Sequence, residues 1–142
     1  MSTVRVLFLA RYRIPHALFS LQWDHYLGGI DRTIVATPLT RDELWPMFER
    51  YGIDTSTWDL VSDDVVYRDY PEVNNWVFAD DFRTYWLRQQ AIKLAFLDII
   101  QADVMLMHDP DTFMIEPYRC VQNGVLNFMV LANTTQGSYD GM

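Results

Sequence analysis

Three short apolar runs constrain the fold of this chain more than any other feature. They occupy residues 4–10 (VRVLFLA), 32–39 (RTIVATPL) and 104–108 (VMLMH). The first run is apolar on both of its alternating faces, which is typical of a strand buried inside a parallel sheet. Helical patterns separate the runs, and strands that alternate with helices indicate an α/β fold. We therefore predict a mainly parallel sheet with helices on both faces, a Rossmann-like arrangement.

The helices and the remaining segments are predicted from local start and stop signals. A helix over residues 16–27 is expected to end at Gly28 and Gly29, and a second helix follows Thr40 and runs to about Tyr51. The best helical pattern covers residues 82–101. The other expected segments are an extended stretch over 58–67, a short extended piece over 112–115, a last strand over 124–132 and a loose tail over 133–142.

Composition indicates a globular protein that does not bind nucleic acid. The 142 residues suffice for one domain with a core, and 50% of them are hydrophobic, which argues against disorder. The formal net charge is −8, whereas binding to a nucleic-acid backbone depends on dense Lys and Arg. A single phosphate group held by one or two basic side chains stays compatible with this charge.

Cellular location is predicted from the cysteine count and from the length of the apolar runs. Cys120 is the one cysteine in the sequence, so it can form no internal disulfide and no thiolate metal site by itself, which fits a reducing compartment. The first apolar run is too short for a signal sequence or a membrane span, and no other uncharged run approaches about 20 residues. These features predict a cytoplasmic protein without a membrane span.

An acidic turn follows the third apolar run, where the sequence changes abruptly to Asp109, Pro110 and Asp111. In parallel sheets, ligands sit at the carboxyl ends of the strands. Because proline fixes its own φ, the two flanking carboxylates can point at one position beyond the strand end. Hard divalent cations such as Mg²⁺ or Mn²⁺ take one or two carboxylates together with substrate phosphates and water. The local pattern leaves an alternative open, a proline turn whose aspartates cap backbone amides.

The helix before this turn carries polar residues within an otherwise apolar pattern. Gln90 and Lys93 fall on one stripe with Trp86, at spacings of four and three residues. A lysine buried in such a helix is costly unless it meets an anion, so the stripe is expected to face the same pocket as the two aspartates. Alternatively, Lys93 extends to solvent and the glutamines bond to the backbone of neighbouring loops.

Helix, strand and acidic turn together resemble a known family. The block YWLRQQAIKLAFLDIIQADVMLMHDPDTFM, residues 85–114, is similar to nucleotide-diphospho-sugar glycosyltransferases of the GT-A fold, and most of all to bacterial and phage-type members. These members carry a Trp, a Gln-Gln pair and a Lys-Leu shortly before a strand that ends in an Asp-X-Asp motif. The resemblance implies a GT-A-like nucleotide-binding half that holds a nucleotide-diphospho-sugar donor through Mn²⁺ or Mg²⁺.

The resemblance also implies roles for individual residues. Asp111 would bind the metal directly, while Asp109 would reach the metal through water or hold the ribose. Gln90 and Lys93, with Trp86 on the same stripe, would hold the diphosphate or the donor sugar. Two further residues just after the first strand fall where such folds contact the base, namely Arg11 and Tyr12.

Two features depart from the family pattern. The residue between the aspartates is usually small, whereas Pro110 stiffens the turn and removes an N–H that could contact phosphate. The chain also ends soon after the motif, so the acceptor-binding half and any catalytic base are expected to be absent from residues 1–142. The sequence then represents a donor-binding domain whose acceptor and catalytic residues are unknown. The open edge expected beside residues 124–132 would favour a homodimer.

Two other functions compete with glycosyl transfer. One is a non-catalytic nucleotide-binding or assembly fragment that keeps the donor-binding half. The other is a metal-dependent phosphatase of the haloacid-dehalogenase type, in which the first aspartate of an Asp-X-Asp motif is the nucleophile. Such enzymes normally carry a threonine four residues after that aspartate and place the motif near the chain start. Here Thr112 follows Asp109 by three residues and the motif comes late, which disfavours the phosphatase.

Overall fold

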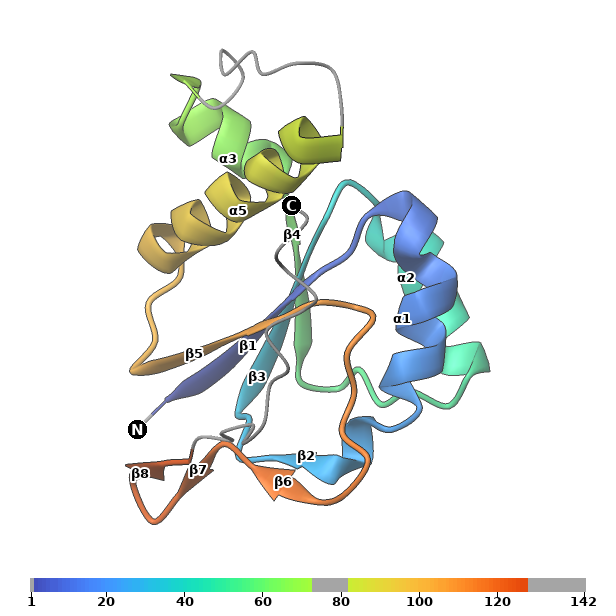
Figure 1. The fold of residues 1–142 in the computed structure, drawn as a ribbon. Coiled ribbons are helices and arrows are strands. Elements are labelled where there is room, and N and C mark those ends of the chain that lie inside the picture. Colours follow the sequence, from blue (N-terminus) through green and yellow to red (C-terminus); the bar gives the residue numbers. More distant parts are fainter. Residues whose placement is uncertain (1, 73–81, 128–142) are drawn as a thin grey trace, which may run out of the picture.

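The computed structural model describes residues 2–72 and 82–127, except for the side chains of residues 67, 82–86 and 88. Its centre is a parallel sheet of four strands in the order β4-β3-β1-β5 (Figure 1). The strands are β1 (Thr3–Phe8), β3 (Arg32–Thr37), β4 (Trp58–Ser62) and β5 (Val104–His108). The predicted α/β class, the parallel sheet and its three apolar strands are confirmed.

The strand order reverses its direction at β1. From β1 the chain passes to β3 and then to β4 on one side, whereas β5 pairs with β1 on the other side. Parallel sheets commonly bind ligands beyond the carboxyl ends of their strands at such a reversal. The loops after β1 and β5 therefore flank the topological switch point of this sheet.

Helices cover both faces of the sheet, as the sequence predicts. α1 (Ile14–Leu21) and α2 (Arg41–Arg50) lie on one face, and α3 (Asp64–Asp69) and α5 (Phe82–Ile99) lie on the other (Figure 1). Two short 3-10 helices flank α1, namely η1 (Arg11–Arg13) and η2 (Asp24–Tyr26). Within residues 2–72 and 82–127, we find no helix with the length and apolar character needed to cross a membrane.

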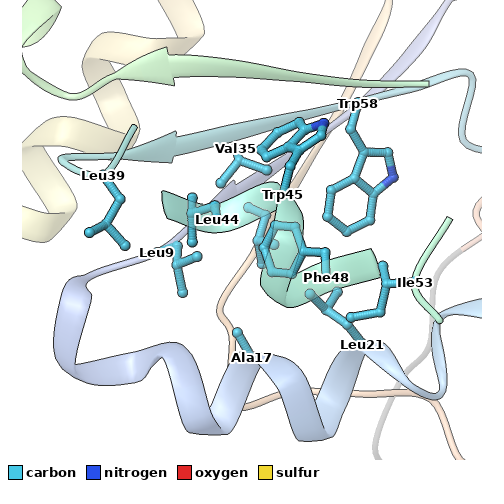
Figure 2. Packing of buried hydrophobic residues seen from close by; sticks show 11 residues of the cluster. Leu9, Ala17, Leu21, Val35, Leu39, Leu44, Trp45, Phe48, Ile53 and Trp58 are labelled. Carbon is cyan, nitrogen blue, oxygen red and sulfur yellow. The ribbon is translucent and has the colours of Figure 1, made fainter. Parts of the chain in front are cut away.

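A separate hydrophobic core lies on each face of the sheet. On the α1/α2 face, the rings of Phe48 and Trp58 pack edge to face with their centroids 5.4 Å apart (Figure 2). On the α3/α5 face, Phe96 packs edge to face against Phe8 of β1, with the centroids 5.6 Å apart. Side chains of β1 alternate between the two cores, so this strand is buried on both faces, as predicted.

α2 begins with a complete capping box. The Thr40 hydroxyl accepts a hydrogen bond from the Glu43 N–H at 3.3 Å, and the Glu43 carboxylate accepts one from the Thr40 N–H at 2.8 Å. The helix ends before Gly52, whose φ of 70° is a left-handed conformation that glycine adopts without strain. Both ends match the predicted bounds of this helix.

Thr40→Ala should lower the free energy of unfolding by about 1 kcal/mol, because the Glu43 N–H loses its partner at the helix start. Urea unfolding followed by circular dichroism measures the change. Thr40→Ser keeps a hydroxyl at this position and is the control. Equal losses for the two variants would show that the cap does not stabilise the fold.

The helix predicted over residues 16–27 is shorter in the structure. α1 ends at Leu21, and β2 (Leu27–Gly28) pairs in parallel with β6 (Tyr118–Arg119). The glycines predicted as a helix stop therefore lie in and directly after a strand. After α1 the chain forms η2 (Asp24–Tyr26), and the Asp24 carboxylate, which accepts a hydrogen bond from Arg5 of β1, holds this segment against the sheet.

The extended stretch predicted over residues 58–67 is wrong in its second half. β4 ends at Ser62, and the chain continues as α3 (Asp64–Asp69). Asp64 lies in the first turn of α3, where a carboxylate interacts favourably with the positive end of the helix dipole. Val66 is fully buried in the core of the α3/α5 face, which fixes this short helix against the sheet.

The strand predicted over residues 124–132 differs from the structure in its described part. β7 (Val121–Gln122) and β8 (Val125–Leu126) form an antiparallel hairpin outside the main sheet. The two residues of its turn, Asn123 and Gly124, have φ values of 53° and 72°. Asn-Gly with two positive φ values is the preferred sequence of a two-residue hairpin turn, so a local signal for this hairpin was present.

Three further predictions concern the C-terminal part of the chain. The extended piece expected over residues 112–115 is not a strand. The end of the predicted last strand, residues 128–132, and the predicted tail over 133–142 lie outside the described residues. The homodimer expected at the edge beside this strand stays a prediction.

Candidate functional site

The candidate site lies at the topological switch point. Leu7 of β1 pairs in register with His108 of β5, so the two strands end at the same edge of the sheet. The loop after β1 contains η1, and the loop after β5 is the acidic turn Asp109-Pro110-Asp111. α5 leads into β5 and supplies side chains to this edge from the α3/α5 face. Three predicted elements of the site are therefore neighbours in space.

Lys93 of α5 is the only lysine in the sequence, and it is bound to the acidic turn. Its Nζ atom lies 2.7 Å from Asp109 Oδ1, and its side chain is 16% exposed. The ammonium group also lies 5.6 Å from the centroid of the Phe8 ring, a favourable position for a cation. The expected contact of Lys93 with the acidic turn is confirmed for Asp109, and the alternative in which Lys93 extends to solvent is wrong.

A glutamine of α5 supports this ion pair, but it is not the predicted one. Gln89 Nε2 donates to Asp109 Oδ1 at 3.4 Å, whereas Gln90 is half-buried at the next position of the helix. Gln89 and Lys93 are four residues apart and share a helix face, so their spacing was a usable signal. Trp86 belongs to α5, but its side chain lies outside the described residues.

Asp111 faces the loop after β1. Its Oδ2 atom lies 3.9 Å from Arg13 Nη1, and the two side chains are 50% and 38% exposed. The Arg13 guanidinium also lies 5.4 Å from the centroid of the Tyr12 ring. Arg11 pairs with Glu43 of α2 at 3.5 Å. Arg11 and Tyr12, the predicted base contacts, are thus exposed beside the site, while Arg13, which the sequence did not single out, reaches the acidic turn.

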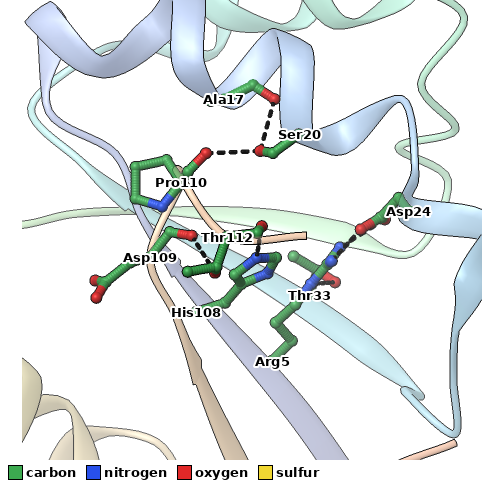
Figure 3. Close-up of polar contacts among 9 residues, drawn as sticks. All are labelled: Arg5, Ala17, Ser20, Asp24, Thr33, His108, Asp109, Pro110 and Thr112. Atoms are coloured by element: carbon green, nitrogen blue, oxygen red, sulfur yellow. Dashed lines mark hydrogen bonds and ion pairs between the residues drawn. The ribbon is translucent and has the colours of Figure 1, made fainter. Parts of the chain in front are cut away.

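Backbone contacts close the acidic turn without its carboxylates (Figure 3). The Thr112 N–H and hydroxyl both donate to the Asp109 carbonyl oxygen, at 3.2 and 2.8 Å. The buried Ser20 hydroxyl of α1 donates to the Pro110 carbonyl oxygen at 2.6 Å and joins the turn to this helix. Within the described residues, the carboxylates of Asp109 and Asp111 contact only side chains. This geometry argues against the alternative in which the aspartates cap backbone amides.

His108 supports the turn from the α1 side of the sheet. Its Nε2 atom donates to the Thr112 carbonyl oxygen at 2.7 Å, because a carbonyl oxygen can only accept. Burial lowers the pKa of this imidazole, so the ring is neutral at pH 7 and its Nδ1 atom is a hydrogen-bond acceptor.

Comparisons with protein-family models, curated proteins and solved structures gave no match for this chain. A functional assignment therefore depends on the chemistry of the switch point and on the resemblance carried by residues 85–114. Within that block, α5, β5 and the acidic turn form one continuous structural unit.

The carboxylates at the switch point suit a hard divalent cation. In the part of the chain that the structure describes, no three His, Cys, Asp or Glu side chains form a group that could hold a metal ion. A structural zinc site, which needs four such ligands, does not fit this arrangement. Mg²⁺ and Mn²⁺ need only one or two protein carboxylates when phosphates and water complete the shell. Asp109 and Asp111, with side chains 42% and 50% exposed, supply that number.

A buried ion pair, which the sequence analysis missed, lies on the α1/α2 face. Arg5 of β1 is 2% exposed, and its Nη1 and Nη2 atoms both donate to the Asp24 carboxylate (Figure 3). Its Nε atom donates to the Thr33 hydroxyl at 3.1 Å, and its guanidinium lies 5.2 Å from the Trp58 ring centroid. The pair borders a cavity of about 580 Å³ at the amino ends of the strands. Because this end is opposite the switch point, we assign the pair to stability.

Proposed function

We propose that this chain binds a nucleoside-diphosphate sugar together with Mn²⁺ or Mg²⁺ at the switch point, as the donor-binding part of a glycosyltransferase. The observation that supports this most is the 2.7 Å ion pair between Lys93 and Asp109 at the carboxyl end of the sheet. Asp111 and Arg13 lie beside it. Parallel sheets bind ligands at this position, and the acidic turn resembles the donor site of GT-A glycosyltransferases.

The charges at the switch point favour a metal–diphosphate complex over either of its components. Asp109 and Asp111 repel a free diphosphate, whereas Lys93 and Arg13 repel a free divalent cation. A diphosphate that carries the cation presents both signs at once, so every charged side chain finds an opposite charge. The existing ion pairs then exchange partners within the site, and no charge is left unpaired.

The loop after β1 suits the nucleoside part of the donor. Tyr12 is 73% exposed, and an aromatic ring in such a position can stack on a base. The Arg11 side chain is 66% exposed and is held by Glu43 at the first turn of α2. Both side chains lie one to two residues before Arg13, the arginine that contacts Asp111.

In glycosyl transfer, the diphosphate departs from the anomeric carbon of the sugar. The negative charge that develops on the diphosphate must be neutralised as it leaves. Mn²⁺ or Mg²⁺, when bound, supplies part of this neutralisation as a Lewis acid. Lys93 would donate to the departing phosphate oxygens. Gln89 would keep the Asp109 carboxylate oriented after Lys93 turns to the phosphate.

Thermal unfolding in the presence of ligands tests the proposal. A ligand at 100 times its Kd stabilises the folded state by about 2.7 kcal/mol, which raises the Tm by several degrees. We expect UDP- or GDP-sugars to raise the Tm only with Mn²⁺, and EDTA to remove the effect. A CMP-sugar, which has one phosphate instead of two, is the control and should stabilise less. Equal stabilisation with and without Mn²⁺, or none with any donor, would refute the proposal.

Lys93→Met should weaken Mn²⁺-dependent binding of UDP at least about tenfold, which corresponds to about 1.5 kcal/mol for one lost hydrogen bond from a charged donor. Binding of uridine, which has no phosphate, should not change. Isothermal titration calorimetry measures both ligands. Equal losses for UDP and uridine would show that Lys93 acts through packing of α5 and not through the diphosphate.

A further inference from the structure

Three aromatic rings form a row beside the acidic turn. The rings of Phe113, Trp23 and Tyr26, which we call the aromatic row, follow one another at centroid distances of 6.2 and 6.1 Å. Neighbouring ring planes are nearly parallel, with angles of 24° and 16° between them. The three rings therefore share one face direction and repeat at a regular interval.

The aromatic row is partly open to solvent. Trp23 and Phe113 are each 39% exposed. Phe19 of α1 packs edge to face on Phe113 with the centroids 5.5 Å apart, and it is 57% exposed. Single exposed apolar side chains are ordinary, whereas several in contact mark a binding surface, because covering their apolar area is favourable. The row and Phe19 together form such a surface.

This surface begins at the acidic turn. Phe113 follows Asp111 by two residues, and Phe19 directly precedes Ser20 in α1. The Ser20 hydroxyl donates to the Pro110 carbonyl oxygen at 2.6 Å and holds α1 against the turn (Figure 3). A ligand on the rings would therefore have one end next to the candidate site.

Charge and area limit the ligands that fit. Single-stranded nucleic acid also stacks on aromatic rings, but it needs dense positive charge, and the formal net charge of this chain is −8. The same charge disfavours an anionic membrane. An aromatic side chain offers about 150–250 Å². Phe19, Trp23 and Phe113, each at most 57% exposed, thus supply far less than the about 800 Å² that a stable protein interface buries on each partner. These limits favour a small neutral ligand.

A sugar has the chemistry that this surface requires. The C–H groups on the face of a pyranose ring carry partial positive charge and pack on the negative face of an aromatic ring. Its hydroxyl groups need polar partners at the edge, and exposed polar side chains adjoin the rings, Gln22 next to Trp23 and Thr112 next to Phe113. In β-1,4-linked glucose the ring substituents are equatorial, so the chain is a flat ribbon whose successive rings can lie on successive members of the row.

We propose that the aromatic row binds a neutral β-1,4-linked oligosaccharide of glucose-type units, with one pyranose ring on Trp23 and the next on Phe113. The end at Phe113 reaches the acidic turn, which places the oligosaccharide as the acceptor of the sugar, a role that rests on the proposed function. In that transfer, an acceptor hydroxyl oxygen bonds to the anomeric carbon, the bond from this carbon to the diphosphate breaks, and the hydroxyl proton passes to solvent. Binding of the oligosaccharide itself requires neither metal nor nucleotide.

Two tetrasaccharides that differ only in their linkage test this binding. Cellotetraose is β-1,4-linked and flat, whereas maltotetraose joins the same glucose units by α-1,4 bonds and is curved. Isothermal titration calorimetry with the full chain, in EDTA and without nucleotide, should show cellotetraose binding at least about fivefold tighter, as expected for one additional ring contact. Absence of cellotetraose binding, or equal affinities for the two sugars, would overturn the proposal. Mn²⁺-dependent binding of UDP is measured separately, so either proposal can fail without the other.

Variants on the two faces of the sheet locate the bound sugar. Trp23→Ala should weaken cellotetraose at least about fivefold, and Trp23→Phe, which keeps a ring, should retain most of the affinity. Leu97 of α5 is 51% exposed on the opposite face of the sheet (Figure 1), so Leu97→Ala is the control and should leave the affinity unchanged. Equal effects of Trp23→Ala and Leu97→Ala would overturn the proposal.

Trp23 of the wild-type chain gives a second readout that does not depend on the folding of a variant. The reagent 2-hydroxy-5-nitrobenzyl bromide alkylates exposed indole rings, and mass spectrometry of the peptide that contains Trp23 measures the rate. Cellotetraose should slow this labelling severalfold, whereas maltotetraose at the same concentration should not. Labelling of Trp23 that cellotetraose leaves unchanged would overturn the proposal.

Discussion

Replacing Asp24 with alanine should lower the free energy of unfolding by about 3 kcal/mol. The substitution leaves the Arg5 guanidinium charged inside the core, where this side chain is 2% exposed. The hydrogen bond to Thr33 and the contact with the Trp58 ring remain, but they do not compensate a buried charge. Asp24 itself is 25% exposed, so water from the adjoining cavity can partly solvate the unpaired guanidinium. We therefore expect the lower end of the range for a broken buried ion pair, about 3 kcal/mol.

The exposed ion pair between Arg32 and Asp59 provides the control for this prediction, since its side chains are 53% and 49% exposed. Asp59→Ala should cost less than about 1 kcal/mol. Urea unfolding measures both variants. A double variant, Arg5→Met with Asp24→Leu, removes both charges and should recover part of the loss, because apolar side chains can replace a buried ion pair. Equal losses for the two aspartates, or no recovery, would contradict the buried-charge explanation.

The sheet and its covering helices were predictable because their signals are local. Each strand of the core is a short apolar run, and the alternation of runs and helices implies the parallel arrangement. The start of α2 was predictable for the same reason, since Thr40 and Glu43 lie three residues apart and form the cap by themselves. The acidic turn was found because it directly follows β5.

The errors arose where tertiary contacts decide the local structure. Arg5 lies in the middle of an apolar run, and its partner Asp24 is 19 residues away, so no periodicity indicates the pair. α3 forms because Val66 can be buried against the core next to α5, which a reading of residues 58–67 alone does not reveal. The Asn123-Gly124 hairpin, by contrast, was a local signal that was overlooked.

In the candidate site, too, contacts that follow from a local pattern were predictable, whereas contacts between distant loops were not. Lys93 and Asp109 are separated by one helix end, a short connection and a strand, so the stripe on α5 sufficed to predict their contact. Gln89 was missed because the stripe was drawn through Gln90, one position away. Arg13 was missed because its contact with Asp111 joins two loops that lie far apart in the sequence. The strand order that brings these loops together is not apparent from either loop.

Asp111→Asn should abolish Mn²⁺-dependent binding of UDP and leave the Tm of the unliganded chain nearly unchanged. The amide carries no charge and is a weaker ligand for a hard cation, so Asp109 alone would oppose Lys93 and Arg13. We expect a loss of affinity of at least about tenfold, or about 1.4 kcal/mol. The ion pair that is lost, Asp111 with Arg13 at 3.9 Å, is partly exposed and contributes less than about 1 kcal/mol to stability.

Glu116→Gln is the matched control for Asp111→Asn, because it removes the same charge from another exposed position of the segment after β5. Calorimetry with UDP, with and without Mn²⁺, and thermal unfolding without ligand should be measured for both variants. A fall in the Tm of Asp111→Asn with unchanged binding would restore the turn-capping alternative, and equal losses of binding in both variants would indicate a general effect of charge. Asp111→Asn leaves the Lys93–Asp109 pair intact. A lost metal response in a chain of unchanged stability would therefore assign the ligand role to Asp111 itself.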